Sequence, residues 1–320
     1  MKVKYAFFGT PEFAATILKK LIGAGYVPAL VVTAPDKPVG RKQVLTPPPT
    51  KIVAQKYDIP VWQPEKLKIP DSRFQIQNSK LFVVAAYGKI LPKEILEIPE
   101  HGCLNVHPSL LPRWRGPSPI QYAILSGDDQ TGTTIMLMDA GIDHGPILEF
   151  RIQKIENRNL IELSKILAER GAQLLIDILP KWVRGEMQPI EQDHPRATYS
   201  KIIKKEDGKI DWTKDAAHIE RMARAFYPWP SAYTFWRDAG KEKMLKIIDA
   251  EAVSDEQTHA KENLRIGTAF MLRGILTVRC GFGALMIRGL QLEGGSEVST
   301  KDFLNGHHNF IGNVLQSQLS

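Results

Sequence analysis

The stretch KYAFFGTPEFAATILKKLIG at residues 4–23 determines the fold class. Its first part is a short apolar run that ends in Gly9, which is typical of a buried strand that stops at a tight turn. Thr10, Pro11 and Glu12 then read as a helix N-cap, a first-turn proline and an acid placed for the helix dipole. The stretch therefore predicts a strand, a tight turn and a helix, which is the first unit of an α/β domain.

The first half of the chain continues this pattern. Further apolar, β-branched runs occur at 27–33, 81–87 and 103–106, with helical or loop segments between them. Such alternation predicts a parallel sheet covered by helices. A long helix at 160–183 has its large apolar residues near one face and is stopped by Gly185, so we place the end of the first domain's core there.

The pattern of predicted elements changes from about residue 207 onward. A helical stretch at 214–226 is followed by short β-like runs punctuated by glycine, and a last helix at 299–304 is capped by Ser299 or Thr300. The β-like runs lie at 231–237, 244–253, 263–272, 274–280 and 283–292. Several short strands at this spacing predict a small β-barrel, for which the oligonucleotide-binding type is one candidate.

Length and polarity predict two domains. At 320 residues the chain exceeds one ordinary domain of roughly 100–200 residues. The stretch 192–209 is polar and lacks a strong period, which suits a linker. We therefore expect a first domain at 1–190, a linker at 191–208 and a C-terminal β-barrel domain at 209–320.

Composition argues against several classes of protein. Hydrophobic residues at 43% and charged residues at 24% are near globular averages, so the chain is not largely disordered, collagenous or coiled-coil. Its apolar runs fall short of the roughly 20 residues that span a bilayer, and no secretory leader pattern opens the sequence. Cys103 and Cys280 lie far apart and outside any C-x-x-C pair, which disfavours a disulfide framework and a thiolate zinc site. We expect a cytoplasmic protein with no metal and no membrane contact.

The basic charge is concentrated in the first third of the chain. The net charge is +7, but residues 1–115 carry 17 Lys and Arg against 8 Asp and Glu, and the remainder has a net charge of −2. Any anionic ligand should therefore meet the first third. A basic solvated face explains the same distribution equally well at this point.

The first turn does not fit a nucleotide cofactor. A dinucleotide fingerprint needs further glycines after Gly9, so that the backbone can approach a pyrophosphate. Pro11 instead removes an amide donor, and Glu12 repels phosphate where a helix N-terminus normally attracts it. The Gly-Lys pairs also lack the spacing of a P-loop, so neither NAD binding nor nucleotide hydrolysis is expected.

The segment NVHPSLLPRWRG at 105–116 carries the chemistry. It begins at the carboxyl end of a predicted strand, where ligands of open α/β sheets bind. Asn105 and His107 alternate by two, so an extended backbone points an amide and an imidazole to one face, an arrangement that suits an oxyanion. A Gly-rich loop within 131–148 brings Asp143 between two strand-like runs, where a carboxylate can be held beside an imidazole. Periodicity alone leaves open that Asn105 and His107 only satisfy local turns.

Several separated segments resemble the 10-formyltetrahydrofolate-dependent formyltransferases. The resemblance rests on NVHPSLLPRWRG followed by Asp143-x-Gly145, and it is closest to the branch that acts on methionyl initiator tRNA. Further matches occur in order over nearly the whole chain: FFGTPEFA at 7–14, TAPDKPVGRK at 33–42, AYGKILP at 86–92, ATYSKIIKKEDGKIDW at 197–212, RAFYPWPSAYT at 224–234 and DFLNG at 302–306. The resemblance implies a Rossmann-like parallel-sheet formyltransferase domain followed by an OB-like β-barrel.

The resemblance also implies the site residues. Asn105, His107 and Asp143 would form the catalytic triad for attack of an amine on the formyl carbon of 10-formyltetrahydrofolate, with Asn105 and protonated His107 stabilising the oxyanion and Asp143 orienting the imidazole. No metal is required. The residues expected to contact the folate are Tyr87, Gly88, Ile90, Leu91, Ser109, Leu110, Leu111 and Pro112.

The basic loop PDKPVGRK at 35–42 is too rich in proline and polar residues for a strand or helix interior, which predicts a solvated surface connection. The resemblance implies instead that this loop engages the acceptor end of the methionyl initiator tRNA, with Lys37, Arg41 and Lys42 as contacts. His144 has no role implied by the resemblance, and we expect it on the surface.

Two alternatives stay open at this stage. A formyltransferase for a small amine, such as a ribonucleotide or an amino sugar nucleotide, would use the same triad, although the basic loop and the barrel argue against it. A non-catalytic RNA-binding protein would explain the charge and the barrel but not the triad. The aromatic residues at 226–236 predict barrel core more than base stacking. We expect the protein to be a monomer.

Overall fold

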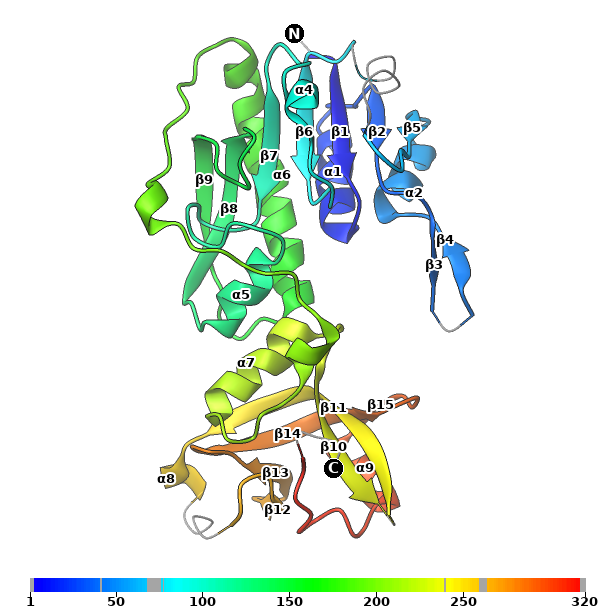
Figure 1. The fold of residues 1–320 in the computed structure, drawn as a ribbon, viewed down its shortest axis with the longest axis vertical. Helices are drawn as coiled ribbons and strands as arrows, with labels where there is room; N and C mark the ends of the chain where they lie inside the picture. The colour runs from blue at the N-terminus through cyan, green and yellow to red at the C-terminus, as the bar shows by residue number, and fades with distance from the viewer. Residues whose placement is uncertain are drawn as a thin grey trace. The chain divides into compact units, whose positions relative to one another are not determined.

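The computed structural model describes residues 3–40, 42–67, 76, 78–238, 240–258 and 264–316. The chain forms two compact units, whose elements are labelled in Figure 1. Unit 1 contains Met1–Ile120, Asp129–Ile155 and Glu162–Lys201, and unit 2 contains Gln121–Asp128, Glu156–Ile161 and Ile202–Ser320. The chain thus passes between the units after residues 120, 128, 155, 161 and 201. Among the described residues no helix is long and apolar enough to cross a membrane.

Unit 1 is built on a seven-stranded sheet in the order β5-β2-β1-β6-β7-β8-β9. The first five strands in this order are parallel, which confirms the predicted α/β architecture, whereas β8 runs antiparallel to both of its neighbours, β7 and β9. The short loop between β8 and β9 requires their antiparallel pairing, because a parallel crossover needs a dozen residues or more. The strands are β1 (Tyr5–Gly9), β2 (Leu30–Val32), β5 (Val61–Trp62), β6 (Leu81–Ala85), β7 (Cys103–His107), β8 (Gln130–Leu137) and β9 (Ile147–Lys154).

Helices cover this sheet. The long helix α6 occupies the range predicted for it and packs against β7 and β8 at Gly171, where an added Cβ would lie 2.7 Å from side-chain carbons of Val106 and Thr133. Only glycine allows this close approach. The helices that the structure describes in this part of the chain are α1 (Glu12–Gly23), α2 (Pro49–Lys56), α4 (Lys93–Leu96), α5 (Pro119–Leu125) and α6 (Leu160–Val183).

The first turn differs from the sequence prediction in one respect. Helix α1 begins at Glu12 with Pro11 in the N-cap position, and no side chain caps it. Thr10 was predicted as the cap, but its hydroxyl donates a 3.0 Å hydrogen bond to the Tyr87 carbonyl instead. The turn after β1 is therefore tied to the turn after β6, which lies next to it in the sheet.

The basic loop forms a hairpin. Strands β3 (Lys37–Val39) and β4 (Val44–Thr46) pair antiparallel, and Figure 1 shows the hairpin extending from the rest of unit 1. The expectation that residues 35–42 contain no strand is wrong, because Lys37–Val39 form β3, but these residues are exposed as a solvated connection requires. Pro38 is tolerated because the ribbon has only two strands, so its missing N–H breaks no ladder in a central strand.

Unit 2 holds an antiparallel sheet in the order β10-β11-β14-β13-β12, with β15 on β14. The segment near the C-terminus pairs with both ends of this order, through bridges Phe235↔Gln316 and Thr268↔Val314, so the sheet curls toward closure as the predicted barrel requires. The strands are β10 (Ala232–Asp238), β11 (Lys241–Val253), β12 (Ala269–Leu272), β13 (Ile275–Arg279), β14 (Ala284–Leu292) and β15 (Glu297–Ser299).

Among the described residues, this sheet is accompanied by α7 (Ala216–Phe226), α8 (Asp255–Thr258) and α9 (Thr300–Gly306). Short 3₁₀ turns lie at His194–Arg196 and Lys205–Gly208. Ser299 caps α9, because its hydroxyl accepts from the Asp302 backbone N–H at 3.2 Å. Trp236 is buried against Phe303 and Phe310, which confirms a core role, whereas Trp229 is exposed.

Candidate active site

Strand β7 presents the two polar side chains that the sequence singled out. Asn105 and His107 are both buried, with 8% and 4% of their surfaces exposed. They point to one face because they are two residues apart on a strand. The neighbouring parallel strand β6 pairs Val84 with Asn105, so the segment after β6 and the segment after β7 leave the same edge of the sheet.

The loop between β8 and β9 brings a carboxylate to this face. Strand β8 runs antiparallel to β7, so the loop after β8 begins beside the amino-terminal end of β7. The loop then folds back toward Asn105 and His107. Asp143 in this loop accepts from the Asn105 amide at 3.3 Å and from the Gly116 backbone N–H at 2.7 Å. Its backbone has φ +46°, a left-handed conformation that aspartate adopts more readily than most residues. The structure thus brings Asn105, His107 and Asp143 together.

His107 lies between two acceptors. Its Nδ1 is 3.5 Å from Asp143 Oδ1, and its Nε2 is 3.1 Å from the Trp114 carbonyl oxygen. Only the doubly protonated imidazolium can donate from both nitrogens at once. Both ring nitrogens face an oxygen acceptor, which orients the imidazole.

The segment after β6 holds four of the residues expected to contact the folate. Tyr87 is 3% exposed and lies edge-on to Phe8, and its hydroxyl finds no hydrogen-bond partner among the described residues. Burial raises the pKa of Tyr87 to about 12. Leu91 is buried, Gly88 has φ +79°, and Ile90 is 83% exposed.

The segment after β7 holds the other four. The Ser109 hydroxyl donates to the Arg113 carbonyl at 2.6 Å, and the Ser109 carbonyl accepts from the Thr134 hydroxyl at 2.7 Å, so this residue closes the turn. Leu111 is buried and precedes a cis peptide bond to Pro112. Leu110 and Pro112 are half-buried and present apolar surface.

The hairpin is fixed at its base. The Asp36 carboxylate accepts from the Lys51 ammonium and the Gln63 amide, each at 2.8 Å. Those two hydrogen bonds, that of Gln63 first, hold the pKa of Asp36 below its ordinary value. Lys37 and Lys42 are exposed, and Arg41 lies outside the described residues.

The hairpin base and the segment after β6 are electrostatically linked. The pKa of Lys89 is lowered by burial, which is the larger cause, and by the positive charge of Lys37. The negative charge of Glu65 raises this pKa and partly offsets the shift. The Lys89 ammonium donates to the carbonyls of Pro64 and Glu65 at 2.6 and 2.8 Å.

Sequence reasoning missed a second layer of polar residues behind Asp143. Arg115 is only 1% exposed, and its guanidinium meets Gln192 and His194. His144 was expected on the surface, and its side chain is 45% exposed; its ring stacks on His194 with centroids 4.0 Å apart and pairs with Asp139 at 2.6 Å. Gln192 lies in a polar stretch without periodicity, so no pattern signals its burial.

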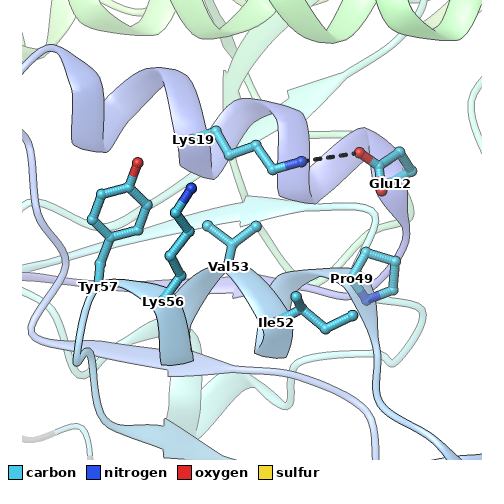
Figure 2. A pocket seen from close by; sticks show the side chains of 7 residues that line it. All are labelled: Glu12, Lys19, Pro49, Ile52, Val53, Lys56 and Tyr57. Atoms are coloured by element: carbon cyan, nitrogen blue, oxygen red, sulfur yellow. Dashed lines mark hydrogen bonds and ion pairs between the residues drawn. The ribbon is translucent and has the colours of Figure 1, made fainter.

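A separate hollow of about 220 Å³ lies between α1 and α2 (Figure 2). It contains none of the residues predicted for the site, and its wall includes the exposed ion pair of Glu12 and Lys19. Over the described ranges, no group of three or more His, Cys, Asp or Glu side chains is placed to hold a metal ion.

The chain matches two family models, Formyl transferase over residues 1–179 and Formyl transferase, C-terminal domain, over residues 202–308. It is 42% identical over 316 residues to the methionyl-tRNA formyltransferase of Citrifermentans bemidjiense, covering 98% of this chain and 96% of that protein. It is 45% identical to the methionyl-tRNA formyltransferase of Caldicellulosiruptor saccharolyticus, with 97% and 98% covered.

Solved structures share the fold at low identity. WlaRD, a sugar 3N-formyl transferase, matches with TM-score 0.62 and 18% identity over 90% of this chain and 98% of that chain. HypX from Aquifex aeolicus matches with TM-score 0.62 and 16% identity over 98% of this chain, which spans about half (49%) of the HypX chain. Structures of these two proteins were determined with 5-N-formyl-tetrahydrofolate and with tetrahydrofolic acid, respectively.

Proposed function

Because this chain belongs to the formyl transferase family, we propose that it transfers the formyl group of 10-formyltetrahydrofolate to the α-amino group of methionyl initiator tRNA. The product is formylmethionyl-tRNA, which serves translation initiation. The observation that carries this function is the match at 42–45% identity, over almost the full length of both proteins, to methionyl-tRNA formyltransferases. The protein is thus an enzyme with a folate co-substrate and a tRNA substrate.

The two alternatives have less support. The sugar formyltransferases resemble this chain in fold at 17–18% identity, which carries no substrate with it. A non-catalytic RNA-binding protein does not account for a buried amide, imidazole and carboxylate gathered at one place.

We propose the following roles for the site. The α-amine attacks the formyl carbon, a C–N bond forms, and negative charge develops on the formyl oxygen. Asn105 and the His107 imidazolium stabilise that charge, and Asp143 keeps His107 charged and oriented. As the tetrahedral intermediate collapses, the bond to the donor nitrogen breaks, and the proton lost by the amine passes through Asp143 and water to that nitrogen. Tetrahydrofolate leaves.

The donor is proposed to bind where the segments after β6 and β7 leave the sheet. Tyr87 offers a buried hydroxyl without a partner among the described residues, and Leu110 and Pro112 offer half-buried apolar surface. The other proposed contacts are Gly88, Ile90, Leu91, Ser109 and Leu111.

The tRNA is proposed to meet the hairpin and the C-terminal domain. Lys37, Arg41 and Lys42 would contact phosphates near the acceptor end. We propose domain boundaries at 1–190 for catalysis, 191–208 for a linker and 209–320 for tRNA binding, and a monomer that acts in the cytoplasm. Light scattering of the purified chain tests the monomer directly.

The decisive experiment compares acceptors. Purified protein is mixed with 10-formyltetrahydrofolate and methionyl initiator tRNA, glycinamide ribonucleotide or an amino sugar nucleotide. We expect appreciable formylation of the first only, because a long polyanion gripped away from the site delivers its amine aligned. Uncharged tRNA should bind without reacting, since it has no α-amine. Equal rates with a small acceptor would contradict the proposal.

A further inference from the structure

We propose that Arg115 and Gln192 are positioning residues that hold Asp143 against Asn105 and His107. This inference deepens the proposed function and rests on it. The two residues come from segments far apart in the sequence, and both side chains are buried, with 1% and 5% of their surfaces exposed.

Gln192 acts on the backbone of Asp143. Its Nε2 donates to the Asp143 carbonyl at 3.0 Å and to the Gly145 carbonyl at 2.7 Å. One amide group thus closes the turn in which Asp143 has φ +46°. These two hydrogen bonds hold the turn in that conformation.

Arg115 fixes which way the Gln192 amide faces. Its Nε and Nη2 donate to Gln192 Oε1 at 3.2 and 2.7 Å. Because a guanidinium only donates, the oxygen of Gln192 must face Arg115, and the NH₂ group must then face Asp143. The guanidinium is held in turn by Tyr199 Oη at 3.3 Å and His194 Nδ1 at 2.9 Å.

The backbone around Arg115 serves the same three residues. The carbonyl of Trp114 faces His107, and the N–H of Gly116 donates to Asp143. The Arg115 backbone itself pairs with the segment 198–200, through Arg115 N–H to the Thr198 carbonyl at 2.9 Å and Ser200 N–H to the Arg115 carbonyl at 2.7 Å. Residues 192–200 therefore contact this site twice, through the Gln192 side chain and through the backbone pairing of residues 198–200 with Arg115.

The test is a double-mutant cycle in the full-length chain. Gln192→Leu removes the donor to Asp143, and we expect the single-turnover rate of methionyl-tRNA formylation to fall about 10- to 100-fold, since a misplacement of about 1 Å has that effect. The KM values for donor and tRNA should change little. In an Asp143→Asn background the same substitution should change the rate much less, because its effect passes through the carboxylate.

Gln192→Glu is the second variant, since it has nearly the same shape and can still accept from Arg115 but cannot donate to the two carbonyls. Arg196→Lys is the matched control: Arg196 lies in the same segment, its side chain is 81% exposed, and the rate should stay within about twofold. An equal fold loss in the wild-type and Asp143→Asn backgrounds, or an unchanged rate in both Gln192 variants, would overturn the proposal.

A second measurement separates this inference from the proposed function. With ¹⁵N-labelled histidine, the ring signals of His107 should shift in Gln192→Leu and Gln192→Glu but not in Arg196→Lys. Failure of the wild-type protein to formylate methionyl-tRNA would contradict the proposed function alone. Unshifted His107 signals in both Gln192 variants would contradict the positioning role, whichever acceptor the enzyme uses.

Discussion

Asp143 is the residue on which the candidate site depends most, because it contacts Asn105, faces His107 and accepts from Gly116. We expect Asp143→Asn and His107→Ala each to lower the chemical step by about 100-fold or more, the usual contribution of a general base or an oxyanion donor. Single-turnover rates with both substrates saturating measure this step. Near-normal rates in either variant, at an unchanged melting temperature, would remove the residue from the mechanism.

Tyr87 combines burial with a hydroxyl that has no partner among the described residues. We expect Tyr87→Phe to leave thermal stability unchanged or slightly higher, because an unsatisfied buried hydroxyl is lost. The KM for the folate donor should rise roughly two- to tenfold if the hydroxyl donates to it. A lower melting temperature together with an unchanged KM would contradict both expectations.

The same residue makes an alkaline prediction. Burial raises the folded pKa of Tyr87 from 10.0 to about 12. Between these values the unfolded chain loses the proton and the folded chain keeps it, so wild-type stability falls as pH rises through that window. Denaturant midpoints of wild type and Tyr87→Phe at pH 9 and pH 11.5 should therefore diverge, with the variant losing less.

The sequence predicted three polar residues that the structure brings together, but not the buried residues next to them. Asn105 and His107 could be predicted because a strand period of two and the end of a strand are visible in the sequence. Arg115 and Gln192 could not, since an arginine and a glutamine in polar stretches normally lie on the surface. Their burial depends on hydrogen bonds between residues 77 apart, which no local pattern encodes.

The β3–β4 hairpin is the element in which local and tertiary information differ most. Its sequence favours an irregular loop, whereas Asp36 is tied at its base to Lys51 and Gln63. Helix α6, in contrast, occupies its predicted range, because 24 residues of amphipathic period outweigh any single contact. The prediction of Thr10 as a helix cap was wrong for a similar reason. The Thr10 hydroxyl donates to the Tyr87 carbonyl, a partner distant in sequence.

We expect Asp36→Asn to loosen the hairpin. The KM for methionyl-tRNA should rise about two- to tenfold, since the hairpin must then be ordered on binding, while the KM for folate stays constant. Gln63 and Lys51 lower the pKa of Asp36 below 3.8, so the contribution of this contact is fully present above that value and disappears as pH falls through the folded pKa. The ¹³C titration of the carboxyl group measures the shift; an ordinary pKa would contradict the restraint.

The salt dependence of tRNA binding tests the two basic residues 41 and 42, which lie in sequence between β3 and β4. We expect Arg41→Ala with Lys42→Ala to reduce the slope of log K against log salt by about one to two units, because fewer counterions are released. Folate affinity should not change. Lys19→Ala is the matched control, since Lys19 is an exposed lysine on α1. A slope unaltered by the double substitution would show that Arg41 and Lys42 do not contact the tRNA.

At the scale of the molecule, the two units do not correspond to two continuous pieces of chain. Within unit 2, Arg221 on α7 donates to the Leu125 carbonyl at 3.1 Å, and Arg224 donates to the Arg158 carbonyl at 3.1 Å. Residues 121–128 and 156–161 therefore belong with the C-terminal part. A cut near residue 208 separates these segments from α7.

We accordingly expect a fragment of residues 1–208 to be less stable than unit 1 in the whole chain. Cys103 provides the measurement, because it is 1% exposed and burial raises the pKa of its thiol to about 12. Its reaction with a thiol reagent at pH 8 should be slow in the full chain and clearly faster in the fragment. Equal protection in both would show that unit 1 does not depend on the rest.

The interleaving of the two units also sets an order of events during synthesis. Residues 121–128, which include the buried Ala123 and Ile124, leave the ribosome long before α7, whose Arg221 donates to the Leu125 carbonyl. At 5–20 residues per second, the 98 residues from 129 to 226, at the end of α7, take roughly 5–20 s to make. Through that interval the segment has no native partner from α7, so the newborn chain carries an apolar stretch that a chaperone can bind.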